Sequence, residues 1–148
     1  MDSSSQYCTF FVDGLYFGLD VLRVQEIIRL QQMTRVPLAP REVRGLINLR
    51  GQIVTAIDLR HRLGLSDRPL DQTPVNVVVR TQDGAVSLLV DEIGDVLDVG
   101  ENLFEPSPET LHRSARELVR GAYKLENRLM LLLDLDRVLQ TSSLNKHP

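Results

Sequence analysis

The chain repeats part of its own sequence, and this duplication limits the folds that it can adopt. Residues 43–49, Val-Arg-Gly-Leu-Ile-Asn-Leu, match residues 119–125, Val-Arg-Gly-Ala-Tyr-Lys-Leu, and the match continues at the same spacing to Asp58 and Asp134. A constant spacing between matched residues is typical of repeated structural units. The sequence therefore predicts two similar units within one chain.

A weaker match links residues 19–37 to residues 88–106 at a shorter spacing, so the second half carries extra residues near Pro106–Glu117. The matches include glycine and polar positions as well as apolar ones, which argues against chance similarity between β-rich segments. Each half is too short to bury a hydrophobic core large enough for a stable fold of its own. We therefore expect a pair of small barrels packed against each other.

Short apolar segments separated by turn residues predict four β-hairpins and an all-β fold with short helices. Two of the hairpins enclose Asp-Gly, which favours a two-residue turn. The expected strand pairs are Tyr7–Val12 with Tyr16–Leu19, Leu46–Leu49 with Ile53–Ile57, Val75–Arg80 with Ala85–Val90, and Tyr123–Leu125 with Leu129–Leu133. Asp58 and Asp134 follow the last strand of each half, where a carboxylate can cap a helix. Ser66–Gln72 reads as a linker, and another short helix is expected near Leu111–Leu118.

Charge and composition narrow the possible functions. The 148 residues include 17 Lys and Arg against 20 Asp and Glu, with a net charge of −3, no basic run and no Trp. A protein that binds nucleic acid needs concentrated positive charge and often aromatic side chains that stack on bases. An RNA-binding barrel is therefore a disfavoured alternative for this chain. The single cysteine, Cys8, cannot form an internal disulfide and is expected to be a buried thiol.

The sequence shows no signal peptide and no apolar run long enough to cross a membrane, because its longest strongly apolar run is Leu129–Leu133. We therefore expect a cytoplasmic protein. The polar ends, residues 1–5 and 141–148, are expected to be flexible tails.

Side chains that could carry catalysis or bind a metal are scattered. His61, His112 and His147 are far apart, and none has metal-ligand spacing to Cys, Asp or Glu. Asp91 and Glu92 are adjacent, so on a strand they would point to opposite faces, and both are expected to be ordinary exposed carboxylates. We expect no catalytic residue, no cofactor and no metal, which leaves an enzyme on a small β-barrel as a disfavoured alternative.

One difference between the halves is not explained by the fold. Arg50-Gly51 corresponds to Glu126-Asn127, and both pairs should form tight turns, but the turn does not explain the arginine. If the strand that contains Glu26 lay beside the strand that ends at Arg50, the two charges could pair. From these residues alone, an ordinary surface ion pair is the simpler interpretation.

Nine short segments carry a resemblance to a known family, and Asn48–Gly51 lies in the most specific of them. They are Val24–Ile28, Thr34–Pro37, Val43–Gly51, Ile53-Val54, Ile57–Arg60, Leu89–Asp91, Asp95–Leu97, Pro106–Pro108 and Leu132–Asp134. Over about residues 6–140 the chain resembles the CheW family of chemotaxis coupling proteins. The resemblance implies two intertwined five-stranded SH3-like β-barrels in a single domain. The barrels would span roughly residues 15–65 and 75–135, with terminal strands open to exchange between them.

The resemblance also implies a function without catalysis. A CheW-like adaptor couples methyl-accepting chemotaxis receptors to a CheA-type histidine kinase, in the cytoplasm at membrane receptor arrays. The tip of the receptor's helical hairpin docks in a groove between the barrels. The residues that match groove positions are Val24, Glu26, Ile27, Arg50, Ser87 and Val96. This resemblance favours a functional Glu26–Arg50 pair that shapes the edge of the groove.

In the CheW family, which this chain resembles, the ends of the barrels contact the regulatory domain of the kinase. The matching residues are Met33, Val36 and Leu38 at the first end, and Glu105 and Thr110 at the second. The second end departs from the family pattern, because some members have a basic residue where Glu105 stands and an aromatic one where Thr110 stands. An adaptor of a pili-motility or surface-sensing pathway is the alternative function.

Overall fold

A computed structural model describes residues 6–29 and 32–140. The strands are β1 (Gln6–Val12), β2 (Leu15–Asp20), β3 (Val24–Ile28), β4 (Val43–Leu49), β5 (Gln52–Asp58), β6 (Val75–Thr81), β7 (Gly84–Val90), β8 (Glu92–Asp98), β9 (Leu103–Glu105), β10 (Val119–Lys124) and β11 (Leu129–Leu133). The helices are α1 (Leu59–Arg62), α2 (Arg113–Arg116) and α3 (Leu135–Leu139). The tails expected at residues 1–5 and 141–148 lie outside the described residues.

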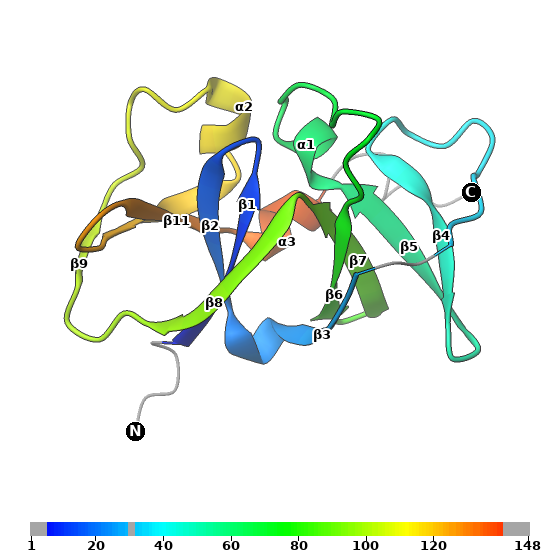
Figure 1. The fold of residues 1–148 in the computed structure, drawn as a ribbon, viewed down its shortest axis with the longest axis horizontal. Helices are drawn as coiled ribbons and strands as arrows, with labels where there is room; N and C mark the ends of the chain where they lie inside the picture. Colours follow the sequence, from blue (N-terminus) through cyan, green and yellow to red (C-terminus); the bar gives the residue numbers. More distant parts are fainter. Residues whose placement is uncertain (1–5, 30–31, 141–148) are drawn as a thin grey trace.

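The strands form two sheets. The six-stranded sheet has the order β8-β1-β2-β11-β10-β9, and the five-stranded sheet has the order β3-β6-β7-β5-β4. Neighbouring strands are antiparallel except for β2 with β11 and β5 with β7, which are parallel. The two sheets lie side by side along the long axis of the molecule, with β9 near one end and β4 near the other (Figure 1). The predicted all-β, SH3-like fold class is confirmed.

The two halves of the sequence exchange hairpins. By the duplication, β1 and β2 correspond to β6 and β7, β3 to β8, β4 to β10, and β5 to β11. The two sheets therefore have the same strand order, except that the six-stranded sheet adds β9 at its edge. Each hairpin, however, lies in the sheet that the other half builds. One sheet therefore spans residues 24–90, and the other combines residues 6–20 with residues 92–133. These limits differ from the expected 15–65 and 75–135 because the exchange moves whole hairpins.

A continuous apolar core joins the sheets. Both contribute fully or almost fully buried side chains, among them Phe10, Phe17 and Leu131 from the six-stranded sheet and Ile57, Val77 and Leu88 from the five-stranded sheet. A smaller cluster fills the interior of each barrel, with aromatic Tyr7 in one and aliphatic Ile47 in the other. The main core is therefore shared between the two sheets.

Local expectations from the sequence hold at the turns and helix starts. Asp58 and Asp134 cap α1 and α3, and their carboxylates accept hydrogen bonds from backbone N–H groups at 3.1 Å. Helix α2 falls inside the expected region. Cys8 is buried, as predicted.

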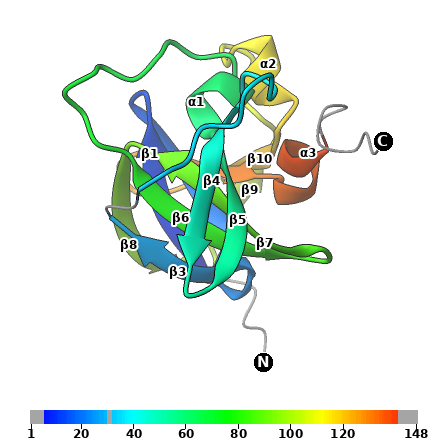
Figure 2. The same cartoon turned by 90° about the vertical axis from the view of Figure 1, so that its right-hand side faces the viewer.

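Helices α1 and α2 lie on the same side of the molecule (Figure 1). Figure 2 looks onto the right-hand end of Figure 1, where β4 and β5 lie. Within residues 6–29 and 32–140, no helix has both the length and the apolar character needed to cross a membrane.

Candidate docking surfaces

An ion pair connects the two edges of the five-stranded sheet. Arg50 at the β4–β5 turn donates through Nη2 to Oε2 of Glu26 on β3. Strands β3 and β4 are the outermost strands of this sheet and are not hydrogen-bonded neighbours, so the contact forms because the sheet curls. Beyond β3, Thr34 and Leu46 exchange two backbone hydrogen bonds of 2.8 Å. The ion pair and this bridge both reach β4 or its turn from the chain at or beyond β3.

The β4–β5 turn presents Arg50 at its tip. Arg50 and Gly51 have φ values of 52° and 89°, as in the two-residue turns that favour glycine. Asn48 Oδ1 accepts a 2.8 Å hydrogen bond from the Gly51 N–H. The hydrogen bond from Arg50 holds the pKa of Glu26 below its ordinary value. The Arg50 side chain remains 68% exposed, so its charge is available to a partner.

The other residues expected at the groove have different surroundings. Val24 is half-buried against the main core, whereas Ile27 is 39% exposed beside Glu26. Val96 is 56% exposed on β8, which is the edge strand of the six-stranded sheet and the counterpart of β3 in the duplication. Val24, Ile27 and Val96 thus supply apolar surface on two equivalent edge strands.

Ser87 does not belong to this surface. Its side chain is fully buried and donates a 2.9 Å hydrogen bond to Asn76 Oδ1. Strand β7 lies between β6 and β5, with both faces largely covered, so alternation along the strand could not show which face was open. A partner could reach Ser87 only if the sheet opened, and we leave it out of the surface.

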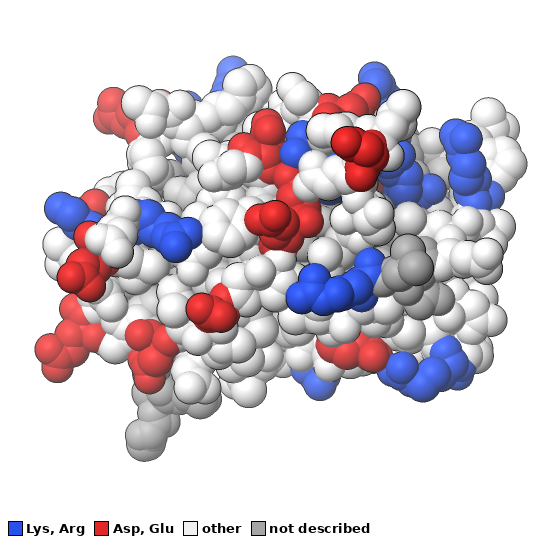
Figure 3. All heavy atoms as spheres, in the orientation of Figure 1, with Lys and Arg blue, Asp and Glu red and all other residues white. Residues whose placement is uncertain are grey.

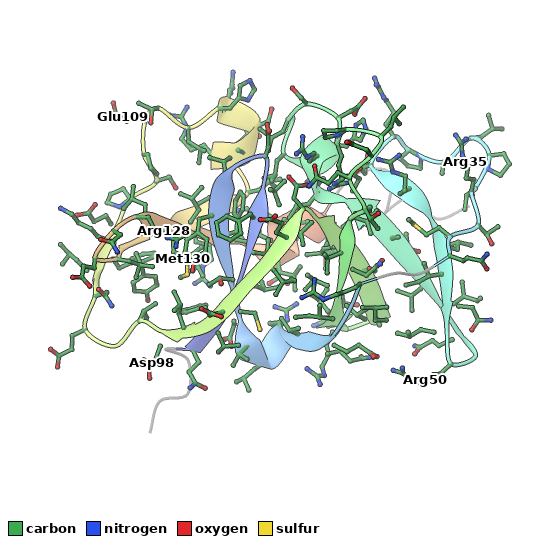
Figure 4. The ribbon with its side chains drawn as sticks, in the orientation of Figure 1. Arg35, Arg50, Asp98, Glu109, Arg128 and Met130 are labelled. Carbon is green, nitrogen blue, oxygen red and sulfur yellow. The ribbon has the colours of Figure 1, made fainter. Side chains whose placement is uncertain are left out.

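The residues expected to contact the kinase at the first barrel end lie together. Met33, Val36 and Leu38 line a hollow of about 750 Å³. Leu38 is completely exposed and has a φ of 64°. Basic side chains share the lining, namely Arg35, Arg41, Arg44 and His61. Figure 4 shows Arg35 on the loop at this end of the molecule.

The second barrel end is built around β9. Glu105 ends this strand and is half-buried, and Thr110 is exposed on the loop that follows. Leu103 and Phe104, the two residues before Glu105 on β9, are also exposed. The Phe104 ring also packs against Tyr123, with ring centroids 4.9 Å apart. Glu105 and Thr110 therefore accompany an apolar surface that the sequence did not single out.

The structure corrects the expectation that Asp91 is an exposed carboxylate. Asp91 is buried and accepts bonds from Arg60 at 2.6 and 3.0 Å, from Arg68 at 2.9 Å and from the Asp13 N–H at 2.7 Å. Glu92 is exposed, as expected. Arg60 and Arg68 lie 31 and 23 residues before Asp91, so no local pattern could have shown these partners.

Asp58 extends this buried network. Besides capping α1, its carboxylate pairs with Arg44 at 2.5 Å and with Arg68 at 3.4 Å. Among the described residues, every buried side-chain nitrogen and oxygen has a hydrogen-bond partner. The network joins the linker, helix α1, the β7–β8 corner and the β1–β2 turn, and so its role is to hold the two sheets together.

The histidines and carboxylates of the described residues do not gather into a metal-binding group. No group of three or more His, Cys, Asp and Glu side chains there could hold a metal ion. His61 pairs with Asp67 at 2.8 Å, and His112 caps α2 through Nδ1.

Comparison with known proteins gives one consistent result. Residues 6–143 match the family described as CheW-like domain. The chain is 31% identical to the chemotaxis protein CheW of Klebsiella aerogenes over 139 residues, which cover 94% of this chain and 84% of that protein. It is 34% identical to the chemotaxis protein CheW of Bacillus subtilis over 134 residues, which cover 90% and 86%.

A solved structure agrees with these sequence matches. The scaffolding protein TtCheW from Thermoanaerobacter tengcongensis superposes with a TM-score of 0.82 at 26% identity, covering 95% of both chains. The chain therefore belongs to the CheW family of chemotaxis adaptors, which are scaffold proteins and not enzymes.

Proposed function

We propose that this protein couples the cytoplasmic tips of methyl-accepting chemotaxis receptors to a CheA-type histidine kinase. The observation that carries the proposal is the Glu26–Arg50 pair, which joins the two outermost strands of the five-stranded sheet and leaves the Arg50 side chain 68% exposed. Charges held in place at the edge of a docking surface suit a helical partner, because they set the orientation of a helix that buries its apolar stripe.

The receptor surface comprises Val24, Glu26, Ile27, Arg50 and Val96. Two of its segments come from the edge strands β3 and β8, and these strands correspond to each other in the duplication. A receptor tip is itself a helical hairpin with two similar helices. Two equivalent edge strands would allow each helix of the hairpin to make an apolar contact with one strand.

The kinase surface comprises the two barrel ends, with Met33, Val36 and Leu38 at one and Glu105 and Thr110 at the other. A receptor on the first surface and a kinase on a barrel end would bring both partners to the same molecule. Simultaneous binding would raise the local concentration of kinase at the receptor without a chemical step. The protein would act in the cytoplasm, at membrane receptor arrays.

The test is reconstitution with receptor-containing membranes and the full-length CheA-type kinase of the same cell. Kinase should co-sediment with the membranes, and its autophosphorylation should respond to the receptor, only when this protein is added. Co-sedimentation and receptor control at the same level without the protein would overturn the proposal.

A further inference from the structure

A second hollow, of about 920 Å³, lies between α3, β5 and the β6–β7 turn. Apolar side chains contribute to its lining, among them Ile53, which is 62% exposed, and the half-buried Val86 and Leu139. Gln140, which directly precedes residues 141–148, also lines it. The hollow is therefore an open, partly apolar surface to which the proposed function assigns no role.

The duplication shows what covers the corresponding place in the other half. Helix α1 is the counterpart of α3, and the chain that follows α1 folds back over it. There the Leu65 N–H donates a 2.8 Å hydrogen bond to the Arg60 carbonyl, and the Leu65 side chain packs against the main core. Arg68, three residues later, is buried and pairs with Asp91 at 2.9 Å. Figure 3 shows acidic and basic side chains next to each other in this area, between the β1–β2 turn and α1.

Both members of the Arg68–Asp91 pair have a leucine as their counterpart. The spacing that relates Asp58 to Asp134 also relates Arg68 to Leu144, and the spacing that relates residues 19–37 to residues 88–106 relates Leu22 to Asp91. Two apolar side chains can take the place of a buried ion pair, because they bury each other without leaving a charge unpaired. The change at both positions therefore conserves a contact between them while changing its chemistry.

Leu22 lies at the rim of the second hollow. It belongs to the short 3-10 helix Val21–Arg23 and is 60% exposed. Its carbonyl accepts a 3.1 Å hydrogen bond from Arg80, which lines the hollow. Arg23 lines the hollow as well and pairs at 3.4 Å with Asp136 of α3, so the 3-10 helix is tied to α3. An exposed leucine thus borders the hollow, at the position where the other half buries Asp91.

We propose that residues 141–148 fold back over α3 into this hollow, with Leu144 packed against Leu22. Leu144 is the one strongly apolar residue among these eight. It follows Gln140 by four residues, which gives an extended chain a reach of about 13 Å. The contact would brace the 3-10 helix where it leads into β3, the strand that begins with Val24. The proposal does not depend on the identity of the receptor or the kinase.

The ion pair of one half can be rebuilt in the other to test this contact. We expect Leu22→Asp and Leu144→Arg each to lower the midpoint of thermal unfolding by about 2–4 °C. The L22D/L144R variant should unfold at a higher temperature than the sum of the two losses predicts, because the new charges attract each other. The matched control is Leu70→Arg, at a completely exposed leucine of the linker, whose effect should simply add to that of Leu22→Asp.

Nuclear magnetic resonance of the wild-type protein gives a second measurement that does not depend on stability. We expect nuclear Overhauser effects between the methyl groups of Leu144 and Leu22 that do not change with protein concentration. A Leu144→Arg variant that keeps both the midpoint and the Leu22 and Val86 methyl signals of wild type would overturn the proposal. Contacts that weaken on dilution would assign the hollow to the segment of a second copy and would equally overturn docking within one chain.

Discussion

Arg60 grips Asp91 with two nitrogens, at 2.6 Å from Nη2 to Oδ2 and 3.0 Å from Nε to Oδ1, and both side chains are buried. Arg60 lies in α1, directly after strand β5 of the five-stranded sheet, whereas Asp91 lies between β7 and β8, where the chain passes into the six-stranded sheet. The pair therefore connects the two sheets at the point where the chain crosses between them.

Asp91→Asn should destabilise the protein strongly. The substitution keeps the shape of the side chain but leaves the charges of Arg60 and Arg68 buried without a full partner, and such a loss costs about 3 kcal/mol or more. Urea unfolding followed by circular dichroism measures it. The control is Glu92→Gln, which removes the exposed neighbouring carboxylate and should change the free energy of unfolding by less than about 0.5 kcal/mol. Equal effects of the two substitutions would contradict the role of the network.

Stability should fall on acidification because of the same pair. Burial raises the pKa of Asp91, but hydrogen bonds from Arg60, the Asp13 N–H and Arg68 outweigh it, so the pKa in the folded protein lies below its ordinary value. A lowered folded-state pKa stabilises the protein above the ordinary pKa and loses that contribution as the pH falls through the folded value. When the pH is lowered from about 5 in steps of about 1 unit, the free energy of unfolding should therefore fall more for wild type than for Asp91→Asn. Parallel losses would contradict this assignment.

Much of the local structure follows from the sequence, because its determinants are local. Turn residues set the hairpins, and Asp58 and Asp134 cap helices through neighbouring N–H groups. The Asp91 network and the burial of Ser87 depend on side chains from distant segments, so neither could be predicted from alternation or spacing. The Glu26–Arg50 contact lies between these cases. The sequence supplied both charges, but only the curl of the sheet brings its two edge strands close enough for them to meet.

Tyr7 should titrate separately from an ordinary tyrosine. Its burial, with a hydrogen bond to Tyr123, raises the pKa to about 12. In a pH titration followed by absorbance at about 295 nm, where ionised tyrosine absorbs, one step should occur at higher pH than the others and disappear in Tyr7→Phe. Because the unfolded chain ionises Tyr7 near pH 10, the contribution of Tyr7 to stability is complete below that pH and is lost as the pH rises toward 12. A late step that persists in Tyr7→Phe would contradict the assignment.

Gly45 and Gly121 should each resist replacement by alanine. The two glycines correspond in the duplication. A Cβ at Gly45 would lie 2.7 Å from the backbone oxygen of Thr34, and a Cβ at Gly121 would lie 2.7 Å from the backbone oxygen of Glu105. Backbone cannot move aside as a side-chain tip can, so each substitution should cost about 1–3 kcal/mol. The control is Gly18→Ala, where the nearest atoms belong to the flexible Met130 side chain. Thermal unfolding would rank the three, and a larger loss for Gly18→Ala than for the other two would contradict the argument.

Arg50→Glu should abolish receptor control of the kinase without unfolding the protein. The side chain is largely exposed, so the fold should not depend on it, but the reversed charge would repel Glu26 and break the contact between β3 and the β4–β5 turn. Reconstituted kinase activity with receptor membranes measures coupling, and circular dichroism checks the fold. The control is Arg113→Glu, a fully comparable charge reversal at an 83% exposed side chain of α2.

The swapped variant Glu26→Arg/Arg50→Glu separates two roles of this pair. If the ion pair serves to fix the edge of the surface, reversing both charges restores the attraction, and part of the coupling should return. If Arg50 instead binds a receptor carboxylate directly, the swap leaves a glutamate at the tip of the turn and coupling stays lost. We expect partial recovery, because the contact joins the two outermost strands of the sheet. Normal receptor control by the single Arg50→Glu variant would rule out both roles and, with them, this surface as the receptor site.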